Sequence, residues 1–236
     1  MDDMRPPIEL GNRRTSVQSI FEFLRDEIVN LRLLPGTKIS EAEVARQFGV
    51  SRQPVRDAFT RLENIDLLLI RPQKATEVRL FSTEDITRAR FIRSALEVEV
   101  LRRAAKMWDE KDKARLDAII KQQEAAIEAK NSRKFNKLDH EFHETLCRVG
   151  RAEFVISAIE ENKSKVARLC RLSLATDDES QELQRLRDVL RDHKEILERL
   201  YARDPEGAAA VGKRHLSRLD DTIKALRESH SHFFED

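Results

Sequence analysis

The sequence predicts a mainly α-helical protein: an N-terminal unit of short helices with a small β-hairpin, followed by an all-α antiparallel helical bundle. Hydrophobic residues make up 40% of the 236 residues, charged residues 37%, and there are only six glycines, a composition typical of amphipathic helices. Five of the six prolines lie at or before Pro72, and the last is Pro205. We therefore expect a domain of short elements interrupted by prolines over 1–80, a helical domain over 81–229 and a disordered tail over 230–236.

In the first domain, apolar spacing and capping residues predict three helices, over 16–33, from Ser40 to Phe48, and from Ser51 to about Asn64. Pro35-Gly36 ends the first helix, and Gly49 lies in a tight turn between the other two. The following stretch IDLLLIRPQKATEVRL reads as two short β segments around 72–74, which can form a hairpin. Helix, paired helices and hairpin together predict a winged helix-turn-helix.

From Ser82 onward the apolar pattern is helical throughout. It predicts six helices, over 83–107, 111–129, 132–149, 152–174, 179–202 and 204–229. Their connections are short enough for antiparallel neighbours in a bundle.

The second helix of a helix-turn-helix lies in the major groove and places its N-terminal side chains on base edges. Arg52 and Arg56 are four residues apart and share a face, with Gln53 beside them; arginine pairs with guanine and glutamine with adenine. Arg71 and Lys74, at the hairpin tip, are placed to reach phosphates or the minor groove. The alternative is that these side chains are merely solvated, since the net charge of +1 does not indicate a polyanion partner.

The run VARQFGVSRQPVRDAFTRL over 44–62 resembles the winged helix of the GntR family of bacterial transcription regulators. This resemblance implies binding to an operator in double-stranded DNA, through the positions Arg46, Ser51, Arg52, Gln53 and Arg56. Two departures concern the wing: the family usually has Gly at the position of Asp66 and another near Lys74-Ala75.

In the segment LDHEFHETL, Asp139 and His143 lie one helical turn apart and therefore side by side. His193 and His215 fall on the last two long helices, each with apolar neighbours at helical spacing. Three histidines and one carboxylate suit Zn(II), and also Ni, Mn or Fe with water completing the coordination. His140 competes with His143, and histidines on helices are often simply packed or solvated.

Residues 83–229 are similar to the FCD effector domain of the FadR-type subgroup, with R93-S-A-L-E97 resembling its first-helix signature. Many such domains hold a metal with Asp-x3-His and two later histidines, which implies Asp139, His143, His193 and His215 here. The resemblance also implies a small organic or sugar acid as effector, held by the metal and Arg93, with Arg90 and Arg168 as further candidates. Arg151 departs from the family, which commonly has Asn after the preceding Gly.

These features predict an effector-responsive regulator that binds a near-palindromic operator as a homodimer and releases repression when the acid binds. A constitutive regulator with a structural metal and a metalloenzyme are the alternatives; against the enzyme, HExxH and a general base beside the ligands are absent. No apolar run approaches the ~20 residues of a membrane span, and the N-terminus MDDMRPPIEL has no apolar signal region. We therefore expect a cytoplasmic protein without a membrane partner.

Overall fold

The computed structural model describes residues 13–176 and 179–235. The chain divides into two compact units, one formed by Met1–Thr83 with His230–Asp236 and the other by Glu84–Ser229. Each unit is described by itself below. None of the helices in the described ranges is long and apolar enough to cross a membrane.

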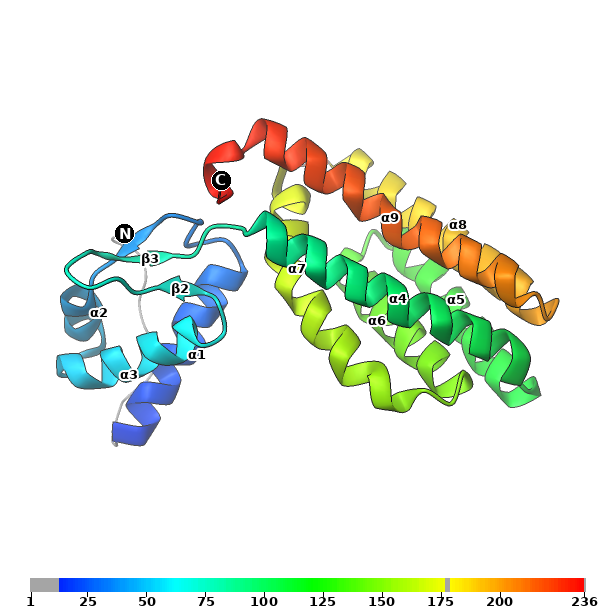
Figure 1. Ribbon diagram of the computed structural model, residues 1–236, viewed down its shortest axis with the longest axis horizontal. Coiled ribbons are helices and arrows are strands. Elements are labelled where there is room, and N and C mark those ends of the chain that lie inside the picture. Colours follow the sequence, from blue (N-terminus) through cyan, green and yellow to red (C-terminus); the bar gives the residue numbers. More distant parts are fainter. Residues whose placement is uncertain (1–12, 177–178, 236) are drawn as a thin grey trace. The chain divides into compact units, whose positions relative to one another are not determined.

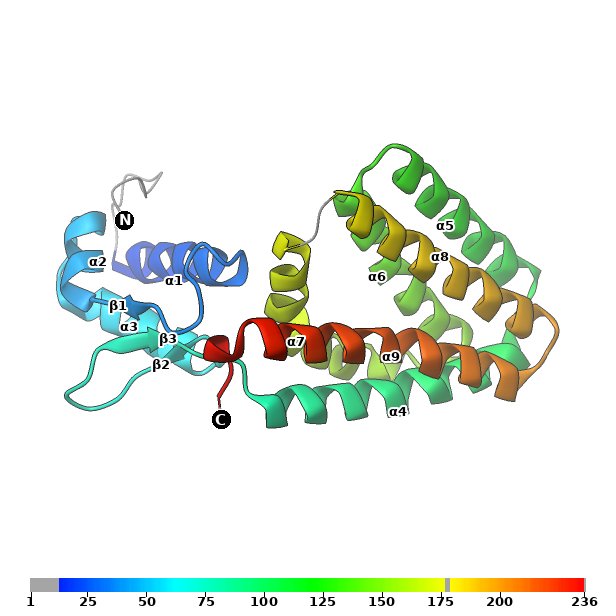
Figure 2. The same ribbon diagram turned by 90° about the horizontal axis from the view of Figure 1, so that it is seen from above.

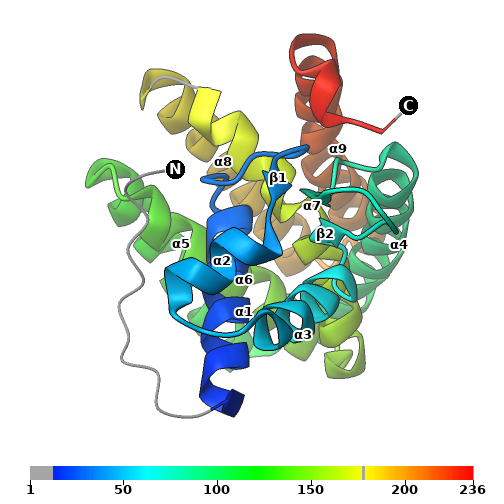
Figure 3. The ribbon, with the colours of Figure 1, turned by 90° about the vertical axis from the view of Figure 1, so that its left-hand side faces the viewer.

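The first unit is a winged helix-turn-helix, as the sequence predicts (Figure 3). Its elements are α1 (Arg13–Val29), β1 (Lys38–Ile39), α2 (Glu41–Phe48), α3 (Arg52–Glu63), β2 (Leu68–Leu69) and β3 (Thr76–Val78). The antiparallel sheet has the order β1-β3-β2, with Ile39 opposite Thr76 and Leu68 opposite Val78. Strand β1 was not predicted, because two residues are too few to show an alternating pattern.

The expected end of the first helix was wrong by four residues. Helix α1 ends at Val29 rather than at residue 33. Leu31 adopts a left-handed φ of 60°, and the backbone N–H groups of Arg32 and Leu33 both donate to the carbonyl of Glu27. This turn closes the helix and buries Leu33 in the core with Ile28.

The caps of α2 and α3 follow the sequence signals but differ in one detail. The Ser40 hydroxyl accepts from the backbone N–H of Glu43, and Gly49 ends α2 with a left-handed φ of 64°. Ser51 occupies the N-cap of α3 without a side-chain capping bond. Buried Val55, Phe59 and Leu62 fix the inner face of α3 and leave its other face exposed.

The second unit is a helical bundle (Figures 1 and 2). Its helices are α4 (Thr83–Met107), α5 (Glu110–Glu128), α6 (Ser132–Val149), α7 (Ile156–Thr176), α8 (Glu179–Tyr201) and α9 (Pro205–Ser229). The predicted ends agree within one residue except at α7. That helix begins four residues later than expected and runs two residues further, because Glu153–Val155 form a separate 3₁₀ turn.

Helix pairs joined by short turns pack side by side in the bundle, α5 with α6 and α8 with α9. Helices α4 and α9 lie antiparallel, since Arg102 pairs with Glu206 and Arg90 with Asp220. The shared core includes Leu116, Phe142, Leu146 and Ile196. Apolar positions on α6, α8 and α9 therefore bring the polar residues between them to one place.

The expectation of a disordered tail was wrong for the described residues 230–235. Ser231–Phe233 form a 3₁₀ turn, and Phe234 makes a parallel bridge with Phe81. The backbone N–H of Phe81 donates to Phe233 O at 2.8 Å, and that of Glu235 donates to Phe81 O at 2.9 Å. Phe233 and Phe234 are buried in this contact. Burial of their apolar surface stabilises the ordered tail, and the local sequence alone does not show that this surface has a partner.

Candidate metal centre and DNA-reading helix

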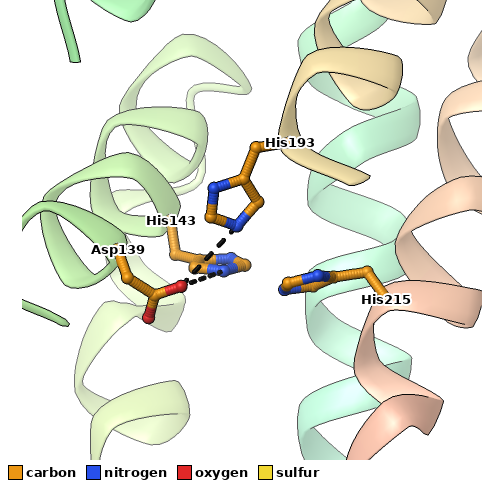
Figure 4. A group of neighbouring side chains, drawn as sticks. All are labelled: Asp139, His143, His193 and His215. Carbon is orange, nitrogen blue, oxygen red and sulfur yellow. Dashed lines mark ion pairs between the residues drawn. The ribbon is translucent and has the colours of Figure 1, made fainter. Parts of the chain in front are cut away.

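Four side chains from three helices meet inside the bundle (Figure 4). Asp139 and His143 lie on α6, whose N-cap Asn131 accepts from the N–H of Lys134, while His193 lies on α8 and His215 on α9. One ligand atom from each lies within 4.8 Å of those of the others. His143 Nε2 and His193 Nε2 lie 3.7 and 3.6 Å from the same carboxylate oxygen, Asp139 Oδ1.

Each histidine has a different outer partner at its Nδ1 atom. His143 Nδ1 lies 2.9 Å from Glu97 Oε2, and His193 Nδ1 lies 2.9 Å from Gln123 Oε1. His215 Nδ1 faces Asp192 Oδ2 at the longer distance of 3.5 Å, without a hydrogen bond. Such partners hold an imidazole with its other nitrogen towards a shared point, which is the usual arrangement around a metal.

The donors fit a divalent cation by burial and charge. His193 is fully buried, yet its Nε2 has no hydrogen-bond partner, and an orphaned polar atom of this kind is costly without a ligand. Burial, helped by His215, holds the pKa of His193 well below its usual value, so the ring is neutral. Burial opposes ionisation of Asp139, but the nearby ammonium group of Lys163, 3.2 Å away, is the main influence that holds its pKa well below the usual range. A carboxylate with three imidazoles is a common donor set for transition metals.

Of the predicted effector residues, Arg93 lies one side chain away from this cluster. Its Nη2 is 2.8 Å from Glu97 Oε1, and both side chains are largely buried. Arg90 instead donates to Leu216 O and pairs with Asp220 on α9, and Arg168 is buried on α7. Burial raises the pKa of the Cys170 thiol against the opposing effect of nearby cations, which are Arg93, Lys163, Arg185 and Arg90.

A small cavity of about 10 Å³ adjoins the centre, lined among others by Glu97, His143, Cys147 and His215. This volume is roughly that of one water molecule. An organic acid does not fit there without movement of side chains. Cys147 lies in the apolar core, where burial raises the pKa of its thiol to about 12, so its role is packing.

The competing histidines lie elsewhere. His140 Nδ1 is 3.1 Å from Glu160 on α7 and is not part of the cluster. His230 and His232 belong to the tail in the first unit. Sequence reasoning missed the outer partners Glu97, Gln123 and Asp192. Each is a polar residue at a buried helix position, and Gln123 stands among the core residues Leu116, Ile119 and Ile127, which is a readable signal.

The predicted DNA-reading residues lie on the exposed surfaces of α2, α3 and the hairpin. Arg46 is in the last turn of α2, and Ser51, Arg52 and Gln53 stand together at the start of α3. Gln53 donates to Asp57 at 2.8 Å, and Arg56 Nε lies 2.8 Å from Glu41 on α2.

In the hairpin, Arg71 lies 3.2 Å from Glu77 on β3, and Lys74 is exposed at the tip. Arg56 and Arg71 thus each pair with an acidic side chain of the same unit.

Two family descriptions match the chain. Residues 16–78 match "Bacterial regulatory proteins, gntR family", and residues 89–218 match "FCD domain". The chain is 34% identical over 219 residues to the HTH-type transcriptional repressor RspR of Escherichia coli K12, covering 93% of each protein. It is 30% identical over 205 residues to a probable D-xylose utilization operon transcriptional repressor of Paenarthrobacter nicotinovorans, covering 87% of each.

Solved structures share the fold. The structure of E. coli McbR/YncC matches with a TM-score of 0.63 and 18% identity, and a putative GntR regulator from Rhodococcus sp. RHA1 matches with 0.60 and 23%. Both alignments cover 89% of this chain and 98% of the other.

Proposed function

Because the chain belongs to the GntR family and carries an FCD domain, we propose that it is a repressor whose operator affinity is set by a small carboxylate bound at a metal centre. The chain is a DNA-binding transcription regulator rather than an enzyme, because its two matching families and its relatives are transcription regulators. Two of these relatives are named repressors, which supports the sign of regulation.

A divalent metal, Zn(II) with Ni, Mn or Fe as alternatives, is held by Asp139, His143, His193 and His215. The observation that carries this assignment is the buried, unpartnered Nε2 of His193 facing the other ligands. When bound, the cation supplies coordination positions for an anionic ligand. The protein's own part is to orient the imidazoles, through Glu97, Gln123 and Asp192, and to exclude bulk water.

The effector is a small organic or sugar acid. Its carboxylate needs a cationic partner beside the metal, and Arg93 is the first candidate because it pairs with Glu97, which contacts His143; Arg90 and Arg168 are further candidates. The protein acts on double-stranded DNA in the cytoplasm, as a homodimer with one winged helix on each operator half-site. Arg46, Ser51, Arg52, Gln53 and Arg56 contact the operator from the helix-turn-helix, and Arg71 and Lys74 from the wing.

The second candidate is a constitutive regulator with a structural metal, favoured by the small volume of the cavity. A thermal-shift screen of small carboxylates and sugar acids, with and without a strong chelator, separates the two. A ligand at 100 times its dissociation constant stabilises the folded state by about 2.7 kcal/mol. Stabilisation by one acid only in the presence of metal supports the sensor. Destabilisation by the chelator with no response to any acid supports the structural role.

A further inference from the structure

Glu97 connects the metal centre to the predicted effector arginine. Its Oε1 accepts from Arg93 Nε at 2.9 Å, and its Oε2 lies 2.9 Å from His143 Nδ1. The Glu97 side chain is only 7% exposed, so water does not replace either partner. The two oxygens of one buried carboxylate are therefore divided between a guanidinium and a metal-ligand imidazole.

This arrangement gives Glu97 an indirect role. Its oxygen meets the Nδ1 of His143, while Asp139 meets the Nε2 of the same ring. Accepting the Nδ1 proton fixes the tautomer that leaves Nε2 as a metal donor and makes that nitrogen more basic. Arg93 withdraws part of the negative charge from the same carboxylate. Any change at Arg93 therefore reaches His143 through Glu97.

We propose that Glu97 is a positioning residue that makes metal binding at His143 and anion binding at Arg93 strengthen one another. When an anion replaces Glu97 as the partner of Arg93, the whole negative charge of Glu97 is available to His143. A cation bound by His143 stabilises the protein with Glu97 in this arrangement. The inference rests on the proposed metal centre. It predicts reciprocal coupling, since each ligand must favour the other equally.

The test is the Zn(II) affinity of purified full-length variants, measured by competition with a chromophoric chelator. Glu97→Gln keeps the side-chain shape but loses the charge, and we expect a loss of roughly 10- to 100-fold. Arg93→Gln should raise the affinity several-fold, because Glu97 then serves His143 alone. A purely structural Arg93–Glu97 ion pair predicts instead that both variants weaken binding. The matched control is Glu99→Gln, on the same helix but 61% exposed.

His193→Ala separates failure of the inference from failure of the metal centre. Loss of Zn(II) binding in His193→Ala with wild-type affinity in Glu97→Gln overturns the role of Glu97 alone. Wild-type affinity in both variants overturns the metal centre as well. Circular dichroism melts of each metal-free variant show whether a loss of affinity reflects unfolding.

A second, independent observation concerns the strap, defined here as residues 230–235. It continues α9, which carries His215, and returns the chain to the first unit. There it is hydrogen-bonded on both sides of Phe81, with the rings of Phe81 and Phe234 5.4 Å apart and Glu235 3.6 Å from Arg79. Phe81 lies between the end of β3 and the start of α4. The two units are thus joined twice, through residues 83–84 and through residues 229–230.

We infer that the strap transmits occupancy of the metal centre from α9 to the wing strand β3. If the two units were joined only through residues 83–84, a displacement of α9 relative to α4 would not be passed on to the first unit. With the strap fixed at Phe81, the same displacement acts directly on the residues that end the wing.

Hydrogen exchange of the full-length protein, apo and with Zn(II), tests this inference. In the wild type, Zn(II) should change exchange both in the bundle and over 76–81. In a chain ending at Ser229 the change in the bundle should remain and that over 76–81 should vanish. A chain ending at Glu235 is the control. The same response at 76–81 in the chain ending at Ser229, or none in the wild type that still binds Zn(II), overturns the strap; no response of the bundle itself instead contradicts the metal centre.

Discussion

Six non-glycine residues in the described ranges have a left-handed φ, and three of them lie at or beside positions where the sequence departs from the family patterns. The φ angle is 57° at Asp66, 58° at Gln73 and 50° at Arg151. Asp66 and Arg151 occupy the positions where the sequence departs from the GntR and FCD patterns, and Gln73 is adjacent to the third departure. The family's Gly and Asn suit these angles because they adopt left-handed φ at lower cost. The departures therefore concern backbone strain at turns and leave the metal ligands unaffected.

Arg151→Asn should stabilise the folded bundle. Asn tolerates the left-handed φ better than Arg, so we expect a gain of about 0.5–1 kcal/mol in the free energy of unfolding. Urea denaturation measures it. The same replacement at Arg115, exposed within α5, should lower stability by a few tenths of a kcal/mol, because Asn is a poorer helix former. Equal effects at the two positions would contradict the assignment of strain to Arg151.

Single-residue roles were predictable from the sequence where spacing alone determines them. Asp139 and His143 are one turn apart in any helix, while His193 and His215 were indicated by their apolar neighbours at helical spacing together with the family resemblance. Glu97, Gln123 and Asp192 were not predicted, because a polar residue on a buried helix face resembles a solvated one until its neighbours are known. The tail was misjudged for the same reason, since the burial of Phe234 depends on Phe81, far away in the sequence.

Among the elements, α3 is the one expected to read DNA, and Arg52 at its start is the sharpest test. Arg52→Ala should weaken binding to a site selected by the wild-type protein from random DNA, by about 1–3 kcal/mol, and relax the base preference there. Fluorescence anisotropy at fixed salt measures both. Arg61→Ala is the control, because Arg61 lies on the same helix over the ring of Phe21 on α1, at 4.2 Å. An Arg52 variant with unchanged affinity and base preference is incompatible with a reading role.

Helices α8 and α9 are joined by one buried carboxylate. Asp192 is fully buried and is paired with Arg214 at 3.2 Å and with Arg218. Asp192→Ala should lower the stability of the chelator-treated protein by about 1–3 kcal/mol, because Arg218 and Arg214 lose a charged hydrogen-bond partner while both remain partly solvated.

Thermal unfolding checks this prediction, with Asp188→Ala as control. Asp188 lies one turn earlier on α8 and pairs with the exposed Arg191. A surface pair of this kind contributes ~0–1 kcal/mol. Similar losses in the two variants would show that burial of Asp192 adds nothing to the link between the helices.

At the scale of the whole molecule, the two units have separate hydrophobic cores. One is built around Ile20, Val55 and Phe59, and the other around Leu116, Phe142 and Ile196. Both units were predictable from the sequence because each has its own run of helical periodicity. Their exact division was not, since the chain returns to the first unit after α9.

Separate cores predict that metal acts on one unfolding transition only. The four ligands all lie in the bundle, so binding stabilises the bundle by RT ln(1 + [L]/Kd), while the first unit binds nothing. In calorimetry of the full-length protein we expect Zn(II) to raise the transition of the bundle, by about 2–4 °C per kcal/mol, and a chelator to reverse it. The transition of the winged helix should stay within a degree. Equal shifts of both transitions would mean that the units unfold as one. The strap would then carry more of the stability than its two hydrogen bonds, one aromatic contact and one ion pair predict.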